Sequence, residues 1–160
     1  MQPAIHWRHR PAMGSGREVA ARQRPIFQPF DIHAEWDHVT RARSNVLLAG
    51  TSTATKATLV QLKPHLREPL RQYTPTKGVS VPQPRKGTLL LLEVARLDRN
   101  QQMQLLEWLD QFDECGQMQV VSTTSQPIFS LVESGAFLAT LYYRLNVIRI
   151  DLIPSGESIL

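Results

Sequence analysis

Apolar and polar positions along the chain alternate between strand-like and helix-like patterns. Short runs that are apolar almost throughout occur at residues 45–49, 88–94, 118–123 and 147–152, and a weaker one covers residues 70–73. A strand that is covered on both faces is apolar on both faces, so these runs predict buried, parallel strands.

Helical patterns separate the strand patterns. They cover residues 32–39, 55–62, 98–116, 128–133 and 137–145. In the third of these segments Asp98 and Gln101 have capping-box spacing, and Gly116 is typical of the position after a helix. Strands that alternate with helices predict an α/β fold, a three-layer αβα sandwich around a mostly parallel five-stranded sheet.

Three segments follow from composition. Residues 1–28 are expected to be a mobile basic leader, residues 29–153 the folded domain, and residues 154–160 a tail. The first 24 residues hold five arginines against one glutamate, which accounts for the whole net charge of +4. The folded part is therefore close to neutral.

Several classes of protein and of site are disfavoured. No apolar run is long enough for a membrane span, the N-terminus lacks the apolar stretch of a secretory signal, and Cys115 is the only cysteine. These features predict a cytoplasmic protein without disulfides. His33 and His38 are five residues apart, which does not suit a metal site on one helix face, so no metal is expected.

A partial phosphate-binding pattern follows the first predicted strand. In the motif G-x-x-x-x-G-K-[ST] the glycines let backbone amides approach phosphate, the lysine binds phosphate and the hydroxyl holds Mg²⁺. Gly50 and Lys56 match this motif, whereas Thr55 replaces the second glycine and Ala57 replaces the hydroxyl residue. Gly50, Thr55 and Lys56 are therefore weak candidates for contacting ATP or ADP, without Mg²⁺-dependent hydrolysis.

Three later blocks resemble one family. Residues 87–94 (GTLLLLEV) resemble the Walker B strand of AAA+ ATPases, in particular of the bacterial activators of sigma-54 RNA polymerase. Residues 137–147 (FLATLYYRLNV) resemble the FREDLYYRLNV signature of these activators, and residues 120–125 (VVSTTS) stand where the sensor strand is expected. With the Gly50 segment, four blocks keep the family's order over residues 44–152. The resemblance implies a truncated, degenerate AAA+-like sigma-54 interaction domain.

Departures from the family pattern predict a pseudo-ATPase. By resemblance, Leu92 replaces the Walker B aspartate, Ser125 the sensor asparagine and Leu138 the first arginine finger, whereas Glu93 and the second arginine, Arg144, are kept. Phosphoryl transfer depends on positioned charge, and an arginine finger alone contributes about 10³–10⁵ in rate. Glu93 is expected to be a relic that hydrogen-bonds a neighbouring amide.

Larger parts of the family's structure are also expected to be missing. The resemblance implies a long insertion with a GAFTGA loop that grips sigma-54, but only residues 74–87 span that gap. Neither a helical lid nor a helix-turn-helix domain is expected after the last strand. Direct DNA binding is therefore not expected.

Three functions remain open. The first is a non-catalytic transcription-regulatory module that binds a protein, either an AAA+ activator or another transcription component, through Arg144, Tyr143 and Asn146. The second is an ATP or ADP sensor that does not hydrolyse nucleotide. The third is a weak ATPase that a partner subunit completes, using Glu93 and Arg144. The sequence leaves the oligomeric state open.

Overall fold

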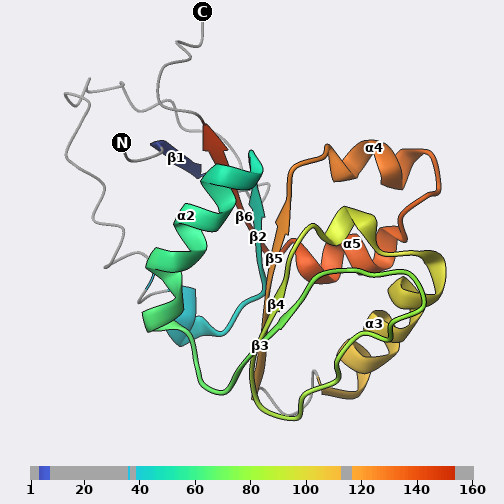
Figure 1. The fold of residues 1–160 in the computed structure, drawn as a ribbon, viewed down its shortest axis with the longest axis horizontal. Coiled ribbons are helices and arrows are strands. Elements are labelled where there is room, and N and C mark those ends of the chain that lie inside the picture. Colours follow the sequence, from blue (N-terminus) through green and yellow to red (C-terminus); the bar gives the residue numbers. More distant parts are fainter. Residues whose placement is uncertain (1–3, 8–35, 37–38, 113–116, 154–160) are drawn as a thin grey trace, which may run out of the picture.

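The computed structural model describes residues 4–7, 36, 39–112 and 117–153, and these form one six-stranded sheet with helices on both faces (Figure 1). The strands are β1 (Ala4–Trp7), β2 (Val46–Ala49), β3 (Leu70–Tyr73), β4 (Gly87–Leu91), β5 (Met118–Thr124) and β6 (Ile148–Ile153). The helices are α2 (Ser52–Leu62), η1 (Lys63–His65), η2 (Val94–Arg96), α3 (Arg99–Phe112), α4 (Ile128–Glu133) and α5 (Ala139–Leu145). No described helix is long and apolar enough to cross a membrane.

The sheet order is β1-β6-β2-β5-β4-β3, and the last five strands are parallel. The predicted αβα sandwich with five parallel strands is therefore confirmed. The structure adds β1, which pairs antiparallel with β6, for example Ala4 with Ile153. Residues 4–7 had been assigned to the mobile leader on composition alone, so this edge strand was missed. Residues 8–28 and 154–160 lie outside the described residues.

Two apolar layers hold the helices on the sheet. On one face, Leu47, Leu89 and Val120 belong to a cluster that includes side chains of α3, α4 and α5. On the other face, Val46, Leu48 and Val121 belong to a cluster that includes side chains of α2. Neighbouring residues of a strand point to opposite faces, which explains why the predicted strands were apolar throughout. Figure 1 shows α2 on one side of the sheet and α3, α4 and α5 on the other.

Two element boundaries differ from the prediction in ways that matter for the site. Helix α2 begins at Ser52, three residues before the predicted start at residue 55. Strand β4 ends at Leu91, although an extended strand to residue 94 was predicted. The backbone at Glu93 is left-handed, with φ of 54°, and the short helix η2 follows. The predicted helix at 32–39 and Gly116 lie largely or wholly outside the described residues.

The predicted capping box at the start of α3 is confirmed. The Gln101 amide donates to Asp98 Oδ1 at 2.9 Å, and the Asp98 amide donates to Gln101 Oε1 at 3.0 Å. Gln101 is almost fully buried, and its Nε2 also lies within hydrogen-bond distance of the Tyr73 hydroxyl and the carbonyls of Thr76 and Val79. One side chain thus caps α3 and holds the connection between β3 and β4 against it.

Replacing Gln101 with Ala should lower the free energy of unfolding by about 2–4 kcal/mol, because it removes a helix cap and leaves buried carbonyls without a donor. Urea denaturation would measure the change. Gln111→Ala is the matched control, since Gln111 is exposed on the same helix. Equal stability of the two variants would contradict the role assigned to Gln101.

Candidate functional site

Only two residues connect β2 to α2 at the carboxyl end of the sheet. The Gly50 amide donates to the Thr124 carbonyl at 3.0 Å, which continues the pairing of β2 with β5. Thr51 is the N-cap of α2, and its Oγ1 accepts a hydrogen bond from the Ala54 amide at 3.2 Å. The helix is therefore established at Ser52, and Lys56 is in its second turn rather than at its first residue.

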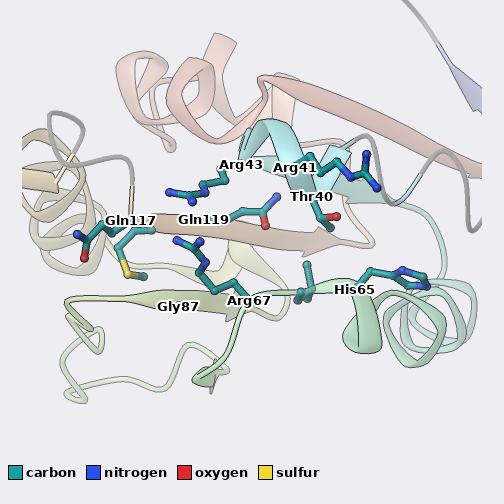
Figure 2. A pocket seen from close by; sticks show the side chains of 10 residues that line it. Thr40, Arg41, Arg43, His65, Arg67, Gly87, Gln117 and Gln119 are labelled. Atoms are coloured by element: carbon teal, nitrogen blue, oxygen red, sulfur yellow. The ribbon is translucent and has the colours of Figure 1, made fainter.

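This early start changes what Thr55 and Lys56 can do. The Thr55 amide donates to the Thr51 carbonyl at 2.9 Å, and the buried Thr55 hydroxyl donates to the Ser52 carbonyl at 3.1 Å. Both groups are used inside the helix, whereas a phosphate loop needs amides that point at the ligand. Lys56 is exposed. Gly50, Thr55 and Lys56 line neither the pocket of about 410 Å³ (Figure 2) nor the pocket of about 270 Å³ that lie among the described residues.

Gly50 has a packing role of its own. A Cβ atom at this position would lie 2.8 Å from Leu152 Cβ and 3.0 Å from the Leu152 carbonyl oxygen. These distances are shorter than van der Waals contact, so only glycine lets the end of β2 pass this close to β6. Gly50 therefore explains the tight connection into α2 without reference to a ligand.

The Walker B position is apolar in structure as well as in sequence. Leu92 is half-buried and packs against the core cluster under α2, as does Ala54. An aspartate at this position would orient Mg²⁺ through water. The Leu92 side chain has no oxygen to offer a metal, and Ala57, at the other Mg²⁺ position, is exposed and has none either. Within the described residues, no group of three or more histidine, cysteine or acidic side chains is placed to hold a metal ion.

Glu93 is held by β5 at the same edge of the sheet. Its amide donates to Thr123 Oγ1 at 3.0 Å, and its carboxylate accepts from the Ser125 amide at 3.1 Å and the Ser125 hydroxyl at 2.8 Å. The expected hydrogen bond from a neighbouring amide is thus confirmed. A left-handed backbone costs a non-glycine residue about 1–2 kcal/mol, and these three bonds offset that cost. Thr123 is the partner that sequence patterns missed, although it lies at the end of a predicted strand.

The two arginine-finger positions both contact α3. Leu138, at the first position, is half-buried against the core, and its amide donates to Gln102 Oε1 at 2.8 Å. Arg144, at the second, forms an ion pair with Asp110 at 2.6 Å and donates to the Leu109 carbonyl at 3.1 Å. A cation at the carboxyl-terminal turn of a helix is favourable because of the helix dipole. Arg144 therefore has a structural role inside its own chain.

The other predicted interface residues lie beside Arg144. Tyr143 is 56% exposed, and its ring is 5.3 Å from that of Tyr142 in an edge-on arrangement. Tyr142 in turn packs against the exposed Phe129 of α4, with the rings tilted by 57° and their centroids 6.0 Å apart. Asn146 follows α5, and its buried Oδ1 has no hydrogen-bond partner among the described residues. Tyr143 is thus available at the surface, whereas the Asn146 oxygen faces inward.

The pKa of Arg149, on β6, is shifted by its surroundings. Burial lowers the pKa of the Arg149 guanidinium, but the hydrogen bond and charge of Asp151, with contributions from Tyr142, raise it above its usual value. The Arg149 Nε–Asp151 Oδ1 distance is 2.8 Å. Arg149 therefore stays protonated at any physiological pH.

The sequence matches the family model of the sigma-54 interaction domain over residues 29–154. The chain belongs to the sigma-54 interaction domain family. One relative is the HTH-type transcriptional regulatory protein TyrR of Enterobacter agglomerans, which is 32% identical over 46% of this chain. That alignment covers only 16% of TyrR.

Solved structures support the same fold. NtrX from Brucella abortus in complex with ADP has a TM-score of 0.59 at 20% identity, and covers 81% of this chain and 37% of its own. The P-loop NTPase domain of an E. coli sigma-54 activator has a TM-score of 0.52 at 17% identity, and covers 77% of this chain and 94% of its own. At these identities the likeness establishes the fold alone. This sigma-54 interaction domain spans well under half of TyrR and of NtrX.

Within this sigma-54 interaction domain, Gly50→Ala should lower the free energy of unfolding by about 1–3 kcal/mol, because the added methyl overlaps Leu152 and its backbone. Thr53→Ala, on the exposed first turn of α2, is the control and should change stability by less than about 0.5 kcal/mol. Urea titration of both variants measures the difference. If Gly50→Ala is as stable as the control, β6 can move at Leu152 to make room for the methyl group, and the packing role assigned to Gly50 is contradicted.

Proposed function

We propose that this chain is a non-hydrolysing sigma-54 interaction domain that regulates transcription by binding another protein. The observation that supports this most directly is the two-residue connection between β2 and α2. Only Gly50 and Thr51 precede the helix, and the amide and hydroxyl of Thr55 bond inside α2. A nucleoside triphosphate would therefore lack the longer loop of backbone amides that cradles its phosphates in a phosphate-binding loop.

Two further features agree with loss of hydrolysis. The position that would orient Mg²⁺ is Leu92, packed on the apolar cluster under α2. Glu93, which in the family activates water, has its carboxylate engaged by the amide and hydroxyl of Ser125. Since catalysis of phosphoryl transfer is mostly positioning and neutralisation of charge, these changes together remove most of its basis.

The segment between β3 and β4 supports a target other than sigma-54. In the family a long insertion precedes the Walker B strand, but here residues 74–86 fold back on α3. Val81 is buried in the core, and Trp108 Nε1 of α3 donates to the Pro84 carbonyl at 3.2 Å. Gln101 of α3 also bonds to this segment. Residues 74–86 are therefore already in contact with a helix of their own domain.

The surface proposed for the partner is the α4–α5 face. It carries exposed apolar side chains at Phe129, Tyr143 and Val147, which are 47%, 56% and 59% exposed. Exposed aromatic residues are the side chains that most often dominate protein interfaces. The proposed partner is an intact AAA+ activator, because α5 of this chain resembles the segment of such activators that faces a neighbouring subunit. Another transcription component is the alternative.

We expect no phosphate release from MgATP above that of Lys56→Ala, since neither a phosphate cradle nor a metal ligand is formed. Thermal unfolding with ATP or ADP, with and without Mg²⁺, tests binding separately. A ligand at 100 times its Kd would add about 2.7 kcal/mol of stability. A shift that Lys56→Ala abolishes would favour the nucleotide-sensor hypothesis, and turnover would favour the partner-completed ATPase.

Adding the chain to a purified, intact sigma-54 activator should lower the ATPase rate of that activator. A mixed assembly would contain a subunit with Leu138 in place of the first finger arginine. Tyr143→Ser should require about tenfold more protein for the same inhibition, if the aromatic ring is an interface anchor. Val60→Ser is the matched control, because Val60 is 68% exposed on the opposite helical layer. An unchanged rate and no co-sedimentation at a large molar excess would exclude this partner.

A further inference from the structure

The two outer strands of the sheet are protected in different ways. At the β3 edge, the Glu68 carboxylate accepts a hydrogen bond from the Leu70 amide at 2.9 Å, and Arg71 and Gln72 are exposed. Polar side chains on an edge strand discourage a further strand from pairing with it. At the other edge the sheet ends in β1, which pairs with β6 alone among the described strands (Figure 1). The chain therefore covers β6 with a strand rather than with polar side chains.

Strand β6 offers a row of backbone groups on the side away from β2. The Ile148 amide donates to the Asn45 carbonyl at 3.0 Å, at the start of the parallel pairing of β6 with β2. Because alternate residues of a strand bond to the same neighbour, the backbone groups of Asp151 and Ile153 point away from β2. β1 meets them in antiparallel register, with Ala4 opposite Ile153. Pairing of the backbone thus defines where a strand docks on this edge.

β1 comes from outside the domain that forms the rest of the sheet. The match to the sigma-54 interaction domain begins at residue 29, whereas β1 ends at Trp7. Residues 8–35 connect β1 to Trp36, which is buried in the cluster under α2. A connection of that length spans at most roughly 90–100 Å, whereas a chain of this size folds to a body roughly 40 Å across. The connection is therefore long enough for β1 to reach the β6 strand of a neighbouring copy.

An uncovered β6 would be a poor surface to expose. Ile150 and Leu152, two residues of this strand, are 0% and 4% exposed and belong to the cluster under α2. Unpaired amides and carbonyls beside apolar side chains form an edge that associates readily with other strands. The β6 edge is therefore expected to be occupied, either by the chain's own β1 or by an equivalent strand.

We propose that the β6 edge is a strand-docking site at which residues 4–7 of a second copy of this chain replace its own β1, which gives a strand-exchanged dimer. A second copy is the occupant of choice because it carries the strand whose register with β6 the structure shows. Exchange keeps the β1–β6 pairing of both copies, so its cost is the entropy of association. A strand joined to its own domain acts at an effective concentration of up to about millimolar, so the closed monomer dominates at micromolar concentration and exchange increases with concentration. The proposal does not depend on the function proposed above, because the site lies on neither α4 nor α5.

Disulfide trapping in the full chain tests the exchange. All variants carry Cys115→Ser, so that the introduced thiols are the only ones. A chain with Ala4→Cys is mixed at high concentration with a chain with Ile153→Cys in a glutathione redox buffer. The two positions are register partners, with Cα atoms about 5.5 Å apart in such a pair, which a disulfide can span. We expect about fivefold more mixed disulfide dimer than from Ile5→Cys with Ile153→Cys, because neighbouring residues of a strand face opposite sides of the sheet.

A single chain with both Ala4→Cys and Ile153→Cys is the control for β1 itself. At micromolar concentration it should form an internal disulfide, seen as an unlinked monomer without free thiols, and the share of disulfide-linked dimer should rise with chain concentration. The thermal midpoint of each reduced variant shows whether it is folded. An internal disulfide without an excess of mixed dimer would overturn the proposal, because β1 would then stay on its own chain. Absence of the internal disulfide would also overturn it, since β1–β6 pairing is its basis.

A synthetic peptide of residues 1–10 distinguishes a second copy from other occupants. In excess, this peptide should lower the yield of mixed dimer, whereas the peptide N-methylated at His6 should not, because the His6 amide lies opposite Asp151 and points at β6. N-methylation at Ile5, whose amide points away from β6, is the matched control and should leave the competition intact. Equal competition by an unrelated peptide with alternating apolar residues would indicate an edge that accepts any strand, and would overturn the assignment to a second copy.

Discussion

The contact between Gly50 and Leu152 constrains how α2 meets the sheet. Because β2 passes β6 with no room for a Cβ atom, the chain leaves the sheet in a fixed direction, and Thr51 then caps the helix at once. A phosphate loop requires the opposite, a longer excursion of unpaired amides before the helix begins. The first turn of α2 therefore occupies the part of the chain in which this family's relatives would hold phosphate. Loss of the second glycine, at Thr55, and burial of its side chain are consistent with that early start.

At the same edge, Glu93 matches the glutamate of the family pattern, and its carboxylate is hydrogen-bonded within its own chain. Its left-handed backbone comes two residues after β4 ends at Leu91, and the Thr123 and Ser125 side chains at the end of β5 bond its amide and carboxylate. A strained backbone that several hydrogen bonds maintain usually marks a functional position. Here the strain persists while the carboxylate is directed at its own chain, so Glu93 joins β4 to β5. Arg144 likewise bonds within its own chain, to Asp110 and to the Leu109 carbonyl at the end of α3.

The order of elements was predictable from the sequence because it depends on local periodicity. The strand at 70–73 and the helix at 128–133 were predicted with the bounds that the structure has, and the Asp98–Gln101 capping box was identified from its spacing. Boundaries that depend on tertiary contacts were missed. The early start of α2 depends on β6, and the end of β4 depends on β5, neither of which a local pattern contains. β1 was missed because four residues in an arginine-rich stretch have no signal of their own, and only pairing with β6 makes them a strand.

The two edges of the sheet differ in how their polar groups are used. At the carboxyl edge, Glu93 and Thr55 bond to neighbouring groups of the same chain, and Leu92 packs on the apolar cluster under α2. At the amino edge, Arg41, Arg43 and Arg67 gather around a hollow with no acidic residue among its described lining. A signal for this existed in the sequence, since basic residues precede three of the predicted strands, at 41–43, 65–67 and 85–86. This sequence signal indicates a shared location only once the strands are known to be parallel, because parallel strands bring their amino ends to one edge. The same topology that brings Gly50, Glu93 and Ser125 together at the carboxyl edge therefore brings the residues before β2 and β3 together at the opposite edge.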